Sequence, residues 1–218
     1  MGLTVFRLNQ YKLDYTSNWI FQQKLNYFKN FREMQEIIKA DLFRYVPKPY
    51  SFCSLLIGFR SQGFRYMFFR RKVHICSRMN PLRLIYWILM RHYMYKYGFQ
   101  IGGKIGKGFF IGHFGTIVTN SDVIIGNNCN IAHGVTIGVT RRGPRAGVPQ
   151  IGNEVWIGTG ATIVGKIYIG NNVLIAPGSY INFDVPDNSI VIGNPGTIKT
   201  CLDATAGYIN NKYSARNQ

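Results

Sequence analysis

An isoleucine or a valine returns every six residues along the stretch from Ile101 to Lys199. From Ile151 onward the period holds over six consecutive units, and a residue with a small side chain usually follows the first position. A backbone that turns a corner after each unit stacks three units into a triangular coil, and equivalent positions of successive coils lie about 4.8 Å apart. The pattern predicts a left-handed parallel β-helix with isoleucines stacked in its interior.

Two insertions interrupt the period. The distance from Ile117 to Ile125 is eight residues, and the distance from Ile137 to Ile151 is fourteen. Both insertions are predicted to fall at the same corner of the prism, and the longer one, residues 139–150, to leave the prism as a mobile arm. Its basic residues are Arg141, Arg142 and Arg145. Loops of this size are more often functional than decorative.

The repeat also aligns residues of different coils into columns. If Ile111, Ile131, Ile157 and Ile175 mark one face, the residues two positions later form one outward column: His113, His133, Thr159 and Pro177. The two histidine rings are therefore expected to be neighbours on adjacent coils, beside the arginine arm. An imidazole at a rigid outward corner suits proton transfer near neutral pH. Whether His133 shares in catalysis or only lines the pocket stays open.

The chain of 218 residues has a net charge of +17, concentrated in its first 100 residues, which carry 17 Lys and Arg against 4 Asp and Glu. This part has no six-residue repeat and predicts helices over 34–45, 52–72 and 81–97, the last beginning with a proline. We expect an α+β chain of three parts: a helical N-terminal domain over 1–100, the β-helix over 101–200, and a polar, loosely ordered tail over 201–218.

Basic and aromatic residues alternate over 64–72. A helix with one core face and one solvated basic face is the favoured interpretation of Arg65, Arg70, Arg71 and Lys72. The alternative is that these residues bind anionic lipid headgroups or nucleic acid. Of the two, we keep peripheral membrane contact as the alternative and expect no nucleic acid. The four cysteines show neither a metal spacing nor a disulfide framework, which indicates a reduced cytoplasmic compartment. No apolar stretch resembles a signal peptide or a membrane span.

The last hundred residues resemble hexapeptide-repeat acyltransferases, within them the serine acetyltransferase-like branch. The motifs that carry the resemblance are 104–108 leading into Ile111-Gly112-His113, 126–131, 135–138, 149–152 and Gly193-Asn194-Pro195-Gly196. The resemblance implies direct acetyl transfer from acetyl-CoA to an acceptor hydroxyl, with His113 as general base and backbone amides stabilising the oxyanion. It also implies homotrimers, or dimers of trimers, that bind acetyl-CoA between adjacent prisms. The implied cofactor-binding residues are Gly158, Thr159, Ala176, Pro177, Asn182 and Lys199.

Two departures from serine acetyltransferases concern the acceptor. Gly112 and Val148 stand where those enzymes carry an Asp and a second His that surround the amino acid. We therefore favour a sugar of a surface polysaccharide or its precursor as acceptor, bound by Arg141, Arg142 and Arg145. Serine O-acetylation for cysteine synthesis is the alternative. A zinc-dependent carbonic anhydrase is a remote third, because His74 and His92 lie in the helical part without ligand spacing; we expect no metal.

Overall fold

The computed structural model describes residues 32–77 and 79–214. The chain divides into two compact units, and the boundary lies between residues 36 and 37. The second unit begins with helical residues 37–45 and continues with α2 (Phe52–Gly58), α3 (Gln62–Ile75) and α4 (Pro81–Tyr97). The predicted helix over 52–72 is thus two helices, separated at residues 59–61. Helix α4 has the predicted bounds, because Asn80 caps its first turn and Pro81 occupies the first helical position.

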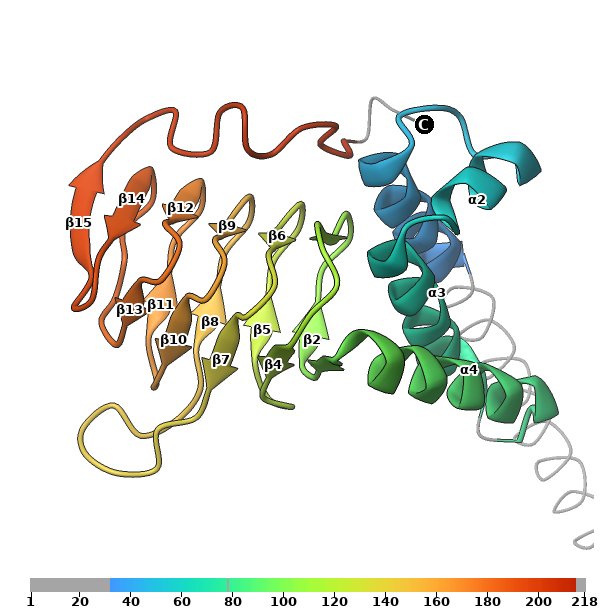
Figure 1. The fold of residues 1–218 in the computed structure, drawn as a ribbon, viewed down its shortest axis with the longest axis horizontal. Coiled ribbons are helices and arrows are strands. Elements are labelled where there is room, and N and C mark those ends of the chain that lie inside the picture. The colour runs from blue at the N-terminus through green and yellow to red at the C-terminus, as the bar shows by residue number, and fades with distance from the viewer. Residues whose placement is uncertain (1–31, 78, 215–218) are drawn as a thin grey trace, which may run out of the picture. The chain divides into compact units, whose positions relative to one another are not determined.

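The β-helix follows α4 directly, and its strands form three sheets (Figure 1). Sheet A contains β1 (Phe99–Ile101), β4 (Ile117–Thr119), β7 (Thr136–Gly138), β10 (Thr162–Val164) and β13 (Tyr180–Ile181). Sheet B contains β2 (Lys104–Ile105), β5 (Ile124–Ile125), β8 (Gln150–Ile151) and β11 (Tyr168–Ile169). Sheet C contains β3 (Phe110–Ile111), β6 (Asn130–Ile131), β9 (Trp156–Ile157), β12 (Val173–Ile175), β14 (Ser189–Ile192) and β15 (Thr197–Thr200). Each strand pairs in parallel with its equivalent in the next coil, except β15, which is antiparallel to β14.

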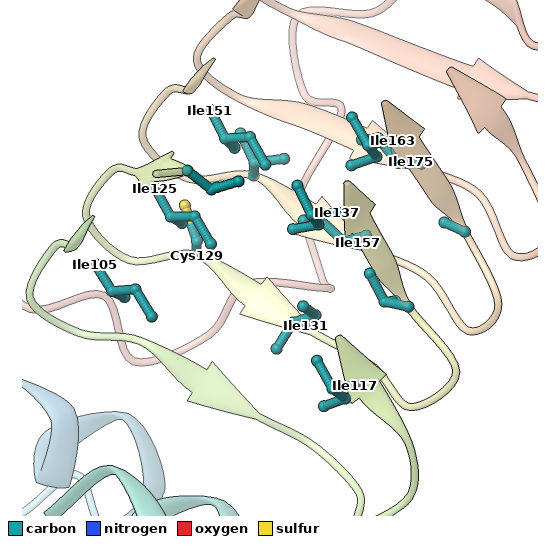
Figure 2. Close-up of a cluster of buried hydrophobic side chains, with 14 of the residues drawn as sticks. Ile105, Ile117, Ile125, Cys129, Ile131, Ile137, Ile151, Ile157, Ile163 and Ile175 are labelled. Atoms are coloured by element: carbon teal, nitrogen blue, oxygen red, sulfur yellow. The ribbon is translucent and has the colours of Figure 1, made fainter. Parts of the chain in front are cut away.

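The predicted solenoid and its register are confirmed. Ile111 pairs with Ile131, Ile131 with Ile157, and Ile157 with Ile175. The isoleucine side chains stack inside the prism, as Figure 2 shows. Cys129 lies among them and is fully buried. Each coil thus covers its neighbour's apolar faces, so the stacking itself is the main source of stability.

Asparagines hold the corner between sheets B and C. The side-chain oxygen of Asn153 accepts a hydrogen bond from the Asn127 amide at 2.8 Å, and that of Asn171 accepts one from the Asn153 amide at 2.8 Å. The next residues of the corner, Asn128 and Asn172, have φ of 54° and 52°. Asparagine tolerates this left-handed conformation better than most residues do, which explains the Asn-Asn pairs in the repeat.

Residues 37–97, the helical cap, close the open edge of the first coil. Arg70 donates to the carbonyls of Ile101 and Gly103, at 3.2 and 2.6 Å. Arg71 donates to the carbonyls of Ile105 and Gly106, both at 2.6 Å. Both arginines are 5% exposed, so the predicted solvated basic face and its lipid-binding alternative are both wrong for them. They bind edge carbonyls that would otherwise lack partners.

The helix over 37–45 completes this cap. Asp41 accepts a hydrogen bond from the Phe109 amide at 2.9 Å and forms a buried ion pair with Arg71 at 3.0 Å. Arg44 donates to the Gly108 carbonyl at 2.8 Å and to the Asn130 side chain at 2.6 Å. The cap and the first coils therefore share one buried polar network within a single compact unit. The division of the chain at residue 100 stays a prediction.

The expectation of a loosely ordered tail is wrong for residues 201–214, which we call the tail strap. The strap runs back from β15 along the solenoid to the helical cap (Figure 1). Tyr208 packs on Trp156 with ring centroids 4.8 Å apart, and Asn130 donates to the Tyr208 carbonyl at 3.0 Å. The strap's Ile209 and Tyr213 are buried. Composition alone does not predict this order, because the strap is held by hydrogen bonds from polar side chains of the solenoid to its backbone.

No helix in the described part of the chain is long and apolar enough to cross a membrane.

Candidate functional site

His113 and His133 lie on adjacent coils at the corner between sheets C and A. Their ring centroids are 5.9 Å apart and their planes nearly perpendicular, at 88°. Both side chains are exposed. Gly115 makes room for the pair, because a Cβ at this residue would approach the His133 Cβ to 3.0 Å. The neighbourhood predicted from the repeat is therefore present, and the roles of the two rings stay predictions.

The backbone of this column is fixed even though its side chains face solvent. The Gly112 amide donates to the Ile131 carbonyl at 3.3 Å, and the Gly160 amide donates to the His133 carbonyl at 3.1 Å. Among the described residues, neither imidazole has a side-chain or backbone hydrogen-bond partner. Rigid backbone and accessible ring nitrogens leave both imidazoles open to an acceptor hydroxyl.

Small residues continue the column beyond the histidines. Gly158 is buried and Thr159 half-buried, while Pro177 is exposed on the next coil. A Cβ at Gly158 would come within 2.7 Å of the Pro177 nitrogen and 2.8 Å of the Ile175 carbonyl oxygen. The coils therefore approach closely here, and the next residues of the column, Thr159 and Pro177, have short side chains.

Asn182 and Lys199 lie apart from this column. Asn182 is exposed directly after β13, where the chain passes from sheet A toward sheet B, and Lys199 is exposed on β15, opposite Ile190. The turn between β14 and β15 has Gly193 at φ 100° and Gly196 bonded to the Tyr180 carbonyl at 3.0 Å. The predicted cofactor residues thus extend from the middle of the solenoid to its last coil.

The arginine arm leaves a different corner from the histidines. Residues 139–149 connect β7 of sheet A to β8 of sheet B, at the same corner as the shorter insertion, as predicted (Figure 1). The histidines lie at the other end of sheet A, so the expectation that His113 stands beside the arm of its own chain is wrong. Repeat spacing places the histidines at the corner before sheet A and both insertions at the corner after it.

Contacts with the solenoid anchor the arm's end. The Lys166 amide donates to the Arg145 carbonyl at 2.8 Å, and the Arg145 guanidinium pairs with Asp184 at 3.1 Å. The Tyr168 amide and Arg145 together hold the pKa of Asp184 below its usual value. Arg141 and Arg142 are exposed. Of the three predicted acceptor-binding arginines, Arg145 therefore already has a carboxylate partner in this chain.

Sequence reasoning missed Phe114, whose side chain is 63% exposed directly after His113. An apolar ring beside a candidate base can pack on a ligand and exclude water from it. The signal was an aromatic residue at an outward position of the repeat. Within residues 32–77 and 79–214, no three His, Cys, Asp or Glu side chains gather where they could hold a metal ion.

Comparisons with known proteins find relatives that share the six-residue repeat. Residues 149–182 match the family described as "Bacterial transferase hexapeptide (six repeats)". The chain is 39% identical over 97 residues to a serine acetyltransferase of Synechococcus elongatus, which covers 44% of this chain and 40% of that protein. It is 33% identical over 147 residues to the "Putative colanic acid biosynthesis acetyltransferase WcaB" of Escherichia coli, which covers 67% of this chain and 90% of that one.

A solved structure agrees in fold. The serine acetyltransferase of Neisseria gonorrhoeae, in complex with serine, matches with a TM-score of 0.62 and 29% identity over 83% of this chain and 73% of that one. The chain therefore aligns with less than half of the cyanobacterial relative and with nearly all of WcaB.

Proposed function

Because the chain belongs to the hexapeptide-repeat acyltransferase family, in its serine acetyltransferase-like branch, we propose that it transfers an acetyl group from acetyl-CoA directly to an acceptor hydroxyl. The observation that carries the proposal is the pair of exposed histidines, 5.9 Å apart, at the head of a column of small residues. An accessible base beside a smooth surface for an extended thioester is what direct transfer requires.

In this proposal an imidazole nitrogen of His113 takes the proton of the acceptor hydroxyl as its oxygen attacks the thioester carbonyl. The carbon–sulfur bond then breaks, and the proton returns from the imidazolium to the departing thiolate. Phe114 excludes water from the reacting groups. His133 either hydrogen-bonds the acceptor or lines the pocket beside it. No covalent acetyl-enzyme forms.

The donor is proposed to lie along the column. Gly158, Thr159, Ala176 and Pro177 contact the pantetheine arm, and Asn182 lies farther along. Lys199, on the exposed β15, pairs with the phosphates. This path supports a groove between two neighbouring prisms, since the residues of one chain form only one wall.

A homotrimer, or a dimer of trimers, supplies the second wall. Within one chain, sheet A separates the arginine arm from the histidine column. In a ring of prisms, the arm of one subunit can reach the column of the next, so that Arg141 and Arg142 meet the acceptor there. The ion pair with Asp184 makes Arg145 an anchor of the arm in this arrangement.

We propose a sugar of a surface polysaccharide, or its precursor, as the acceptor. WcaB, the relative matched over 90% of its length, is named for acetylation in polysaccharide synthesis. Val148 stands where serine acetyltransferases carry the second His, and its side chain packs against the hydrophobic core of the prism. A small amino acid therefore finds no imidazole at this position. Serine is the second candidate, because the chain is 39% identical to a serine acetyltransferase over the repeat region.

The test is thiol release from acetyl-CoA by the purified full chain, with serine and with a panel of sugars and polysaccharide fragments as acceptors. His113→Ala should lower kcat/KM by about 10²-fold or more if this ring is the general base. His92→Ala, which removes an exposed histidine of α4, is the matched control. Unchanged turnover in His113→Ala contradicts the base assignment, and turnover on serine alone contradicts the sugar acceptor.

A further inference from the structure

Helix α4 presents a row of uncovered apolar side chains. Leu84 is 62% exposed, Ile85 52% and Ile88 53%. These positions are one, three and four residues apart, so they lie on one side of the helix. The opposite side packs on the molecule: Tyr93 stacks on Phe69 at 5.6 Å. A helix that served only to cover the core would have polar residues on its outer side.

The row lies on the half of α4 that points away from the β-helix (Figure 1). Met79, which precedes the helix, is 91% exposed, and Leu82, in the first turn, is 49% exposed. A hollow of about 440 Å³ opens at the same place, lined by Met79, Asn80, Pro81, Arg83, Leu84 and Trp87. The surface is therefore larger than scattered single hydrophobic residues would give.

Charge shows what kind of partner fits. Asp41 is the only acidic residue between positions 37 and 100, and it is buried against Arg71. No carboxylate of the cap therefore faces solvent. On α4, the Arg91 guanidinium lies 5.5 Å from the Trp87 ring and 4.8 Å from the Tyr95 ring, and Lys96 is exposed one turn farther along. The partner must offer negative charge beside an apolar layer.

We propose that α4 docks peripherally on an anionic lipid bilayer. Leu84, Ile85 and Ile88 enter the boundary between headgroups and acyl chains, and Arg91 and Lys96 face the phosphates. Trp87 and Tyr95 lie at headgroup level, where amphipathic rings are favoured. Nucleic acid supplies the charge but no apolar layer. The surface is distinct from the basic cluster over 65–72, whose Arg70 and Arg71 are buried in the cap.

Vesicle flotation with the full chain tests the proposal. The protein should float with vesicles of phosphatidylcholine mixed with phosphatidylglycerol, should stay behind with phosphatidylcholine alone, and should be released by salt. Ile85→Glu with Ile88→Glu should lower the partition coefficient by at least about tenfold, because two side chains leave the apolar boundary and two negative charges enter. Ile124→Glu, at an apolar residue of β5 that is 42% exposed, should bind like the unaltered chain.

Several outcomes overturn the proposal. Equal binding by the double variant and the unaltered chain places the membrane contact elsewhere. No flotation of the unaltered chain refutes docking of α4 on an anionic bilayer. A lower mass of the double variant in light scattering identifies a second copy of the chain as the occupant. Thiol release from acetyl-CoA in solution checks that each variant is folded, so a failed membrane test leaves the proposed transfer unaffected.

Discussion

Replacing Arg71 with methionine tests whether the buried ion pair fastens the helical cap to the first coil. The guanidinium bonds the Asp41 carboxylate at 3.0 Å and the carbonyls of Ile105 and Gly106 at 2.6 Å each. Side chains of the pair are 6% and 2% exposed. Methionine keeps much of the volume but removes every donor, so a buried carboxylate is left without its counter-ion. Such a loss costs about 3–5 kcal/mol, and each orphaned carbonyl adds about 1 kcal/mol.

We expect a loss of about 5–7 kcal/mol in the free energy of unfolding for Arg71→Met. For a chain of this size, this loss corresponds to a fall in Tm of roughly 10–30 °C. Arg60→Met makes the same charge change at an exposed position and should stay within about 0.5 kcal/mol of the unaltered chain. Adding Asp41→Asn to Arg71→Met should restore about 2 kcal/mol, since a neutral amide can still accept from the Phe109 amide.

Circular dichroism during heating and urea titration measures these differences. Burial raises the pKa of the Asp41 carboxyl, and Arg71 is the main influence that opposes this rise. Without Arg71 the folded-state pKa rises further above the value in the unfolded chain. The loss should therefore be full above the raised pKa of Asp41 in the variant and should shrink as the pH falls through that pKa. A cost for Arg71→Met no larger than that for Arg60→Met would refute the reasoning.

Three further changes test other parts of the structure. Burial raises the pKa of the Cys129 thiol to about 12, so mass spectrometry after iodoacetamide treatment at pH 8 should find the exposed Cys53 alkylated and Cys129 modified only after unfolding. Gly158→Ala should lower Tm more than Gly138→Ala, because a Cβ at Gly158 would meet the Pro177 nitrogen at 2.7 Å, whereas one at Gly138 would make only an ordinary contact with Val164 at 3.5 Å; equal losses would contradict this packing. Because its pKa is lowered, Asp184 should stay ionised, and keep the arm anchored, until the pH falls below the ordinary aspartate value; carboxyl titration by NMR measures this.

The six-residue period predicted most of the β-helix because each unit repeats the same physical constraint. Ile131 must face inward as Ile157 does, and this fixes the register and the pairing of His113 with His133. Position within a coil also fixed the corner at which the arm leaves. The repeat thus predicts the solenoid, in which each strand pairs with its equivalent in the neighbouring coil.

The cap and the strap were missed because their partners lie far away in sequence. Arg70 and Arg71 have the composition of a solvated face, and only the exposed edge of the first coil explains their burial. The strap needs no long apolar stretch, because Asn130 and Asn172 of the solenoid donate hydrogen bonds to its backbone carbonyls. The relation of the arm to the histidines does follow from repeat spacing, since the histidines precede the strands of sheet A and the arm follows them.

Arg44 joins the first coil to the strap, which continues from the last coil. It donates to the Gly108 carbonyl of the first coil at 2.8 Å and to the Asn210 carbonyl of the strap at 3.0 Å. An open stack of coils can fray from either end, since each coil depends only on its neighbours. Here the strap returns from the last coil to the first, so release of the last coil also weakens the contacts of the first coil. A stack joined in this way is held at its first coil and, through the strap, at its last, so its coils should melt together.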